Sequence, residues 1–332
     1  MAEYKTIKGF KTQSYATDPV PATAAWSSGG TMNNARYELA GCGLQTAGLV
    51  FGGATPVKNE TETYNGTAWT EVNNLNLARA SLGGAGTNTA GLAFGGNVPP
   101  AASGWKNETE TWDGTSWTET NNLNQGRVAP AGAGITTAAL AMGGNYPNTA
   151  YVGLVESWNG TSWTEENDLI TARAYAQAAT QGTTTASLVF GGYTGSNSAD
   201  TESYNGTSWT EVNNLNTART RAGGAGTQTV AVCFGGDPGP VAITETWDGT
   251  SWTEAADLST GRSDLAGFGT SSLALAAAGR PPTTGVTEEW TDYSPGVGQT
   301  MLNEGQIWYN TTGGALKYTA SAGAWASGAA MN

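Results

Sequence analysis

Six arginines and six glutamates recur at fixed places in the 332-residue sequence. Each arginine stands ten residues after a tryptophan, and each glutamate stands two residues before a tyrosine or tryptophan. Such a series has two interpretations: a charged ring that holds an anion or does acid–base chemistry, or a set of structural ion pairs. Strict repetition favours structural ion pairs or turn contacts between blades, because an active site uses a residue once, and buried charges are expected to be paired. The arginines are Arg36, Arg79, Arg127, Arg173, Arg219 and Arg262, and the glutamates are Glu62, Glu110, Glu156, Glu202, Glu245 and Glu288.

Histidine is absent from the sequence, and cysteine occurs twice, as Cys42 and Cys233. The missing imidazole excludes His-based acid–base catalysis, Ser-His-Asp and Cys-His nucleophiles and every His-containing zinc or copper site. Two cysteines form neither a four-ligand metal cluster nor a disulfide framework, so we expect both to be small buried apolar residues. We therefore predict no catalytic residue, no metal and no cofactor, and we expect a protein that is not an enzyme.

The charge balance argues against two classes of partner. The formal net charge is −13, and only 14 lysines and arginines are spread along the chain. Nucleic-acid binding needs such residues clustered on one face, so we expect no nucleic-acid partner. No apolar run is long enough to span a bilayer, and the first residues lack the apolar stretch of a secretory signal. We expect no membrane insertion.

A repeat organises the chain. The tryptophan and its arginine are followed by a segment of glycine and alanine, an apolar run that ends in Gly-Gly, the glutamate with its aromatic partner, and an Asn-Gly or Asp-Gly dipeptide. Such dipeptides are typical of type I′ hairpin turns, in which both central residues have positive φ. Four short strands in about 45 residues are typical of a β-propeller blade. The repeated tryptophans, which we interpret as scaffold, are Trp26, Trp69, Trp117, Trp163, Trp209 and Trp252.

The order of the strands predicts how the ring closes. The segment of small residues is expected to lie innermost, where the blades crowd around the axis, and the apolar run is expected to be buried between blades. The sixth copy ends near Trp290, and Pro295 stands where its tryptophan should be. Trp26 precedes the first copy without a preceding strand of its own. We therefore predict that the strand around Trp26 completes the sixth blade and leaves no exposed edge.

Over residues 22–294 the sequence resembles the kelch-repeat family, on the Gly-Gly runs, the paired aromatics and the arginine that opens each unit. The resemblance implies an all-β, six-bladed kelch-like propeller and constrains function little. The copper enzymes of that family need histidine ligands, which this sequence lacks. The Asp-Gly-Thr-Ser-Trp segments at Asp113 and Asp248 differ from a sialidase Asp-box in spacing, and a propeller hydrolase is the weakest interpretation. The Asn-Gly-Thr sequons are interpreted as turns.

The linkers between the second and third strands differ most among the copies. They share one face of the propeller with the connections between blades. Four aromatic residues in them could stack on sugars or on a protein partner, or else pack back over the blade edges. These candidate rim residues are Trp105, Tyr146, Tyr151 and Tyr193.

The two ends lie outside the repeat. We divide the chain into an N-terminal arm (1–20), the propeller (21–295) and a C-terminal hairpin extension (296–332) suited to docking on another subunit. The hairpin is similar to short units of tailed-bacteriophage structural proteins, and the Thr/Asn/Gly-rich acidic propeller resembles phage virion components. The resemblance implies a virion structural protein assembled in the host cytoplasm, most simply tail-associated (fibre, nozzle or adaptor). Its partners would be other virion proteins, copies of itself and a host-surface glycan or receptor. A capsid decoration protein and a bacterial carbohydrate-binding propeller remain alternatives.

Overall fold

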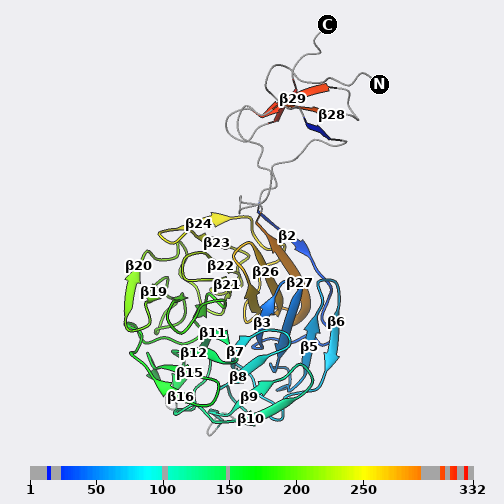
Figure 1. The fold of residues 1–332 in the computed structure, drawn as a ribbon. Helices are drawn as coiled ribbons and strands as arrows, with labels where there is room; N and C mark the ends of the chain where they lie inside the picture. Colours follow the sequence, from blue (N-terminus) through cyan, green and yellow to red (C-terminus); the bar gives the residue numbers. More distant parts are fainter. Residues whose placement is uncertain are drawn as a thin grey trace. The chain divides into compact units, whose positions relative to one another are not determined.

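Six four-stranded antiparallel sheets are arranged as blades around one axis (Figure 1). The structure is a computed structural model and describes residues 13–15, 24–98, 104–146, 150–292, 307–310, 315–319 and 325–327. All regular secondary structure in these ranges is β-strand. The central part of the chain is therefore a six-bladed β-propeller, as the repeat predicts.

Each blade runs from an inner strand near the axis to an outer strand at the rim. Blade 1 is β3 (Ala40–Leu44), β4 (Ala47–Phe51), β5 (Thr61–Tyr64) and β6 (Trp69–Val72). Blade 2 is β7 (Gly83–Gly86), β8 (Gly91–Phe94), β9 (Thr109–Trp112) and β10 (Trp117–Thr120). Blade 3 is β11 (Ala131–Ile135), β12 (Ala138–Met142), β15 (Val155–Trp158) and β16 (Trp163–Glu165), with a small ribbon of β13 (Asn145–Tyr146) and β14 (Ala150–Tyr151).

The second half of the ring repeats this order. Blade 4 is β17 (Gln177–Ala178), β18 (Ser187–Phe190), β19 (Thr201–Tyr204) and β20 (Trp209–Val212). Blade 5 is β21 (Gly223–Gly226), β22 (Ala231–Phe234), β23 (Thr244–Trp247) and β24 (Trp252–Ala255). Blade 6 is β25 (Ala266–Gly269), β26 (Leu273–Gly279), β27 (Thr284–Thr291) and β2 (Ala25–Ser28).

The N-terminal strand closes the ring. Strand β2 pairs antiparallel with β27, and Trp26 lies opposite Trp290. Blade 6 thus takes three strands from one end of the repeat and one from the other. The prediction from the position of Trp26 is confirmed. Strand β2, from before the first copy, joins the three strands of the sixth copy in one sheet.

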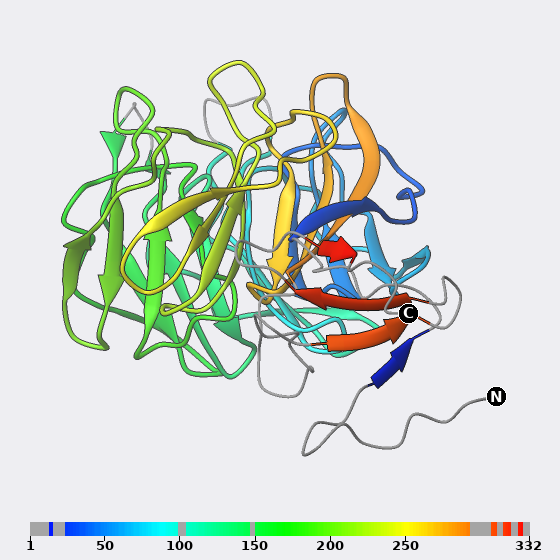
Figure 2. The ribbon, with the colours of Figure 1, turned by 90° about the horizontal axis from the view of Figure 1, so that it is seen from above.

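Small residues let the inner strands approach the axis. These six strands contact one another in a closed circle, from β3 through β7, β11, β17, β21 and β25 back to β3. A Cβ atom at Gly132 would lie 2.2 Å from the carbonyl oxygen of Gly84 in the preceding blade, so only glycine fits there. Strand β17 is shorter than the other inner strands, and its segment, AQAATQGT, lacks their glycine pattern. In Figure 2 the strands run roughly along the axis, so the turns lie at two opposite faces.

The outer hairpins differ from the expected type I′ turn. Tyr64 pairs with Trp69, which leaves a four-residue loop, 65–68, and only Gly66 in it has a positive φ, of 89°. Instead, the side-chain oxygen of Asn65 accepts hydrogen bonds from the backbone N–H groups of Thr67 and Ala68, each at 2.9 Å. The Asn-Gly dipeptide predicts the hairpin correctly, and the side-chain cap explains the longer loop.

Residues from both chain ends form a second unit. It comprises residues 1–23 and 293–332, whereas residues 24–292 form the propeller unit. Its described part is one sheet in the order β1 (Gln13–Tyr15), β28 (Ile307–Asn310), β29 (Ala315–Thr319) and β30 (Trp325–Ser327). Strands β28 and β29 are the hairpin that the alternating sequence predicts, and β1 pairs parallel with β28.

Candidate functional site

The repeated arginines and glutamates form six buried ion pairs. Each arginine lies in the connection that enters a blade, and each glutamate lies on the third strand of that blade. All six arginine side chains are at most 2% exposed. The pairs are Arg36–Glu62, Arg79–Glu110, Arg127–Glu156, Arg173–Glu202, Arg219–Glu245 and Arg262–Glu288.

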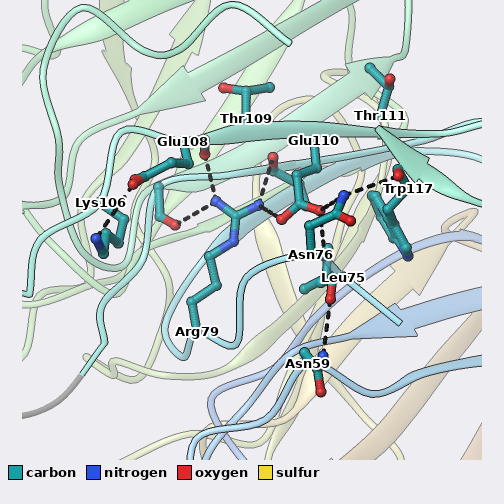
Figure 3. Close-up of polar contacts among 12 residues, drawn as sticks. Asn59, Leu75, Asn76, Arg79, Lys106, Glu108, Thr109, Glu110, Thr111 and Trp117 are labelled. Atoms are coloured by element: carbon teal, nitrogen blue, oxygen red, sulfur yellow. Dashed lines mark hydrogen bonds and ion pairs between the residues drawn. The ribbon is translucent and has the colours of Figure 1, made fainter. Parts of the chain in front are cut away.

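The partners of one pair show what the series does (Figure 3). The guanidinium of Arg79 donates to the Glu110 carboxylate at 3.1 Å and to backbone carbonyls, including that of Glu108. The other carboxylate oxygen of Glu110 accepts from the backbone N–H and side-chain amide of Asn76, at 2.8 and 3.0 Å. Burial lowers the pKa of Arg79, and Glu110 opposes that shift. Both members of the pair are thus bonded to the protein's own groups.

The repeated tryptophans connect neighbouring blades. In five interfaces the indole N–H donates to a threonine hydroxyl on the third strand of the preceding blade, as Trp163 does to Thr109 at 3.0 Å. The third blade carries Val155 at the threonine position, and Trp209 donates to the carbonyl of Asn167 at 3.0 Å instead. The five pairs are Trp26–Thr244, Trp69–Thr287, Trp117–Thr61, Trp163–Thr109 and Trp252–Thr201.

A different set of residues surrounds the axis at the face where the inner strands begin. They stand two residues after each repeated arginine, and each has a φ between 49° and 55°, although none is glycine. Their backbones form a closed circle of hydrogen bonds, each N–H donating to the carbonyl of the residue one blade back, at 2.7–3.2 Å. We call these six residues the axial mouth: Glu38, Ser81, Ala129, Tyr175, Arg221 and Asp264.

The axial mouth opens into a small cavity of about 100 Å³. All six residues of the mouth line it, together with the beginnings of the inner strands. Farther along the axis, the side chain of Gln181 in blade 4 donates to the carbonyl of Gly43 in blade 1, at 3.2 Å. Because blades 1 and 4 lie on opposite sides of the ring, this side chain crosses the axis. The cavity is a shallow pocket.

Charge is concentrated on one side of the axial mouth. Arg221 Nε lies 3.1 Å from Asp264 Oδ1, and Arg280 Nε donates to Asp264 Oδ2 at 2.7 Å. The guanidinium of Arg221 lies over the ring of Tyr175, and that of Arg280 lies over the ring of Tyr37, at 4.3 and 4.5 Å. Burial raises the pKa of Asp264 to about 6, although both arginines oppose the shift. Burial also raises the pKa of Tyr175.

The aromatic residues expected at the rim are brought together in part. The rings of Tyr151 and Tyr193 meet edge to face, with centroids 5.4 Å apart. Tyr146 lies on β13, whose partner strand β14 contains Tyr151, and it is 40% exposed. Trp105 lies in blade 2, where it pairs with Asn97 and is partly buried. Tyr151 and Tyr193 therefore meet, whereas Tyr146 pairs with Ala150 on the other face of the ribbon and Trp105 lies in blade 2.

Sequence reasoning missed the axial mouth. Its six residues are an acid, a hydroxyl, a methyl group, a phenol, a base and another acid. Each stands two residues after an arginine that is the same in all six copies. Within a repeat, a fixed position whose chemistry varies widely among the copies is the signal that could have found it. The other available signal is that Arg221 and Arg280 do not belong to the repeated series.

Three further findings concern the described residues. Cys42 and Cys233 are buried free thiols, and burial raises the pKa of Cys233 to about 11. Among the residues that the structure places, no group of three or more Cys, Asp or Glu side chains is arranged to hold a metal ion. Over the same ranges, no helix has the length and hydropathy needed to cross a membrane.

Comparison with known proteins defines the fold alone. No protein-family model matches the sequence, and no curated protein matches it. A solved structure described as "Structure of YjhT" superposes with a TM-score of 0.66 at 11% sequence identity, covering 78% of this chain and 95% of that chain. At this identity the similarity shows a shared propeller architecture and transfers no function.

Proposed function

We propose that the protein is a structural component of a bacteriophage virion: a kelch-like propeller, most simply of the tail, that assembles with other virion proteins and contacts a host surface. The observation that carries the proposal is the division of the chain into two units, with residues 1–23 and 293–332 in one and the propeller in the other. The unit formed by the two chain ends would attach to the particle, and the propeller would be displayed on its surface. A rigid scaffold with individual loops on one face suits display.

The test is to purify phage particles released by lysis from a host in which this chain is produced, and to quantify it by mass spectrometry. We expect a constant copy number per particle and labelling of the tail by a gold-conjugated antibody. Labelling of the head would instead favour capsid decoration. A chain found in the soluble fraction and absent from particles would contradict a virion role.

A carbohydrate-binding propeller is the second candidate, and the edge-to-face pair of Tyr151 and Tyr193 favours it. Neighbouring partly exposed tyrosines offer apolar faces and hydroxyl groups to a sugar. On a glycan array, Tyr193→Ala should then remove binding, whereas Trp105→Ala in blade 2 should leave it unchanged. Equal binding by both variants and the unmodified protein would exclude the pair of Tyr151 and Tyr193 as the sugar site.

A further inference from the structure

Two arginines of this chain lie outside the repeated series. The sequence contains eight arginines, and six of them are the repeated series. The other two, Arg221 and Arg280, come from different blades, and both contact Asp264 at the axial mouth. The lysines of the described propeller, Lys58 and Lys106, each pair with the glutamate two residues later. In a chain of net charge −13, both unrepeated arginines converge on one place.

Asp264 holds Arg280 by a hydrogen bond and attracts Arg221 as an ion pair, without a hydrogen bond to its Nε atom. Each of its carboxylate oxygens faces the Nε atom of one arginine, at 3.1 Å for Arg221 and 2.7 Å for Arg280. The rings of Tyr175 and Tyr37 support the two guanidiniums from their flat faces. Both arginine side chains remain accessible, at 29% and 37% exposure. A guanidinium held in this way has lost much of its freedom before a ligand arrives, and the edge formed by its two Nη atoms matches an oxyanion.

Other carboxylates near Arg221 leave room for a ligand. Asp237 Oδ2 lies 3.9 Å from Arg221 Nη1, beyond hydrogen-bonding distance. Glu38 lines the same cavity as Arg221 from the opposite side of Asp264, and its charge acts on Asp264 and Arg280. Together with Asp264, these acids outnumber the two arginines, so the affinity for an anion should depend on each of them.

We propose that the axial mouth binds an oxyanion, the carboxylate or phosphate group of a small ligand, on the Nη edge of Arg221. Arg280 contacts the other carboxylate oxygen of Asp264 and does not line the cavity, so it adds positive charge only at longer range. The cavity of about 100 Å³ accommodates several water-sized groups. It therefore holds the anionic group and the atoms next to it, and a larger ligand extends onto the surrounding face. Ser81 and Ala129 form the uncharged side of the same cavity. The inference goes beyond the virion role and does not depend on it.

Calorimetric titration of the purified full-length protein tests the proposal, with inorganic phosphate and D-glucuronate as probes and D-glucose as the uncharged control. Phosphate and glucuronate distinguish a phosphate-bearing from a carboxylate-bearing ligand. We expect one of them to bind and glucose to bind at least tenfold more weakly. Arg221→Gln should weaken binding about tenfold or more, the loss of a charge-assisted hydrogen bond. Arg280→Gln should weaken it in the same direction.

Two further variants make the outcome decisive. Glu38→Gln should tighten binding, because it removes a negative charge from the cavity, and Lys58→Gln, which removes a paired cation elsewhere, should change nothing. Absence of binding by both probes at tens of millimolar would overturn the proposal. So would equal losses in Arg221→Gln and Lys58→Gln, which indicate unspecific attraction, or loss of binding in Glu38→Gln, which indicates a cationic ligand. Circular dichroism of each variant establishes that the propeller is folded.

Discussion

The arginines of this protein occupy two contrasting regions. In the scaffold, six arginines are fully buried, and each is paired with a glutamate of its own blade. At the axial mouth, Arg221 and Arg280 are partly exposed, share one carboxylate and stack on tyrosines. One residue type thus occurs in two different environments. In a repeat protein, identity between copies marks architecture, whereas divergence at a fixed position marks a candidate site.

The largest expected effect is on the scaffold. Glu110→Gln leaves the Arg79 guanidinium buried without its counterion, so the free energy of unfolding should fall by about 3–5 kcal/mol. Glu108→Gln is the matched control, because its partner Lys106 lies 3.4 Å away at the surface and the pair should contribute less than about 1 kcal/mol. Chemical denaturation of both variants measures the difference. Equal losses would contradict the division between scaffold and surface.

The axial mouth should respond to pH through Asp264. Its pKa is raised from 3.8 to about 6, chiefly by burial and also by Glu38, against Arg280 and Arg221. Its contribution to stability is therefore fully present below pH 3.8 and is lost as the pH rises through 6. The stability of the protein relative to Asp264→Asn should fall by about 2 kcal/mol between pH 4 and pH 7, because the unfolded state is already partly ionised at pH 4. Denaturation curves at both pH values measure this difference, and a constant difference would show that Asp264 is not desolvated.

The interfaces between blades offer a smaller contrast. Thr109→Val removes the acceptor of the Trp163 indole N–H, which stays buried, so the loss should be about 1–3 kcal/mol. The reverse exchange, Val155→Thr, should also destabilise by about 1 kcal/mol, because Trp209 already donates to Asn167 and the new hydroxyl is buried without a partner. Urea denaturation compares the two variants. A stabilising Val155→Thr would show that the third blade merely lacks a bond the others have.

The smallest expected effect is on thiol chemistry. Burial raises the pKa of both Cys42 and Cys233, so neither forms the reactive thiolate in the folded protein. Alkylation with iodoacetamide at pH 8, followed by intact mass measurement, should give no label on the native protein and two labels in denaturant. Rapid labelling of the native chain would mean that an interface between blades opens.

Much of the fold can be predicted from the sequence, because the same residue pattern recurs six times. Asn65-Gly66 marks a hairpin, Arg79 marks the entry to a blade, and the displaced Trp26 identifies the strand that closes the ring. The exact turn could not be predicted, since the Asn65 side chain caps a four-residue loop in place of a type I′ turn. The turn type depends on the hydrogen bonds that the Asn65 side chain accepts, and the dipeptide alone does not specify them.

The candidate site could not be predicted in the same way. Residues of the axial mouth such as Glu38, Tyr175 and Asp264 are far apart in sequence, and they meet only because the ring closes. Their positive φ angles could not be predicted from the sequence, because such angles are unusual for residues other than glycine. The candidate rim aromatics were predicted in part: Tyr151 and Tyr193 meet, whereas Trp105 lies in another blade.

The central claim is that one group of arginines holds the propeller together and the other group does not. The most direct test is the free energy of unfolding of Arg262→Gln and Arg280→Gln, measured side by side at pH 5, where Asp264 is mostly protonated. Arg262→Gln should lose about 3–5 kcal/mol, because Glu288 is left buried and unpaired. Arg280→Gln should lose less than about 1 kcal/mol. A loss in Arg280→Gln as large as that in Arg262→Gln would contradict the account.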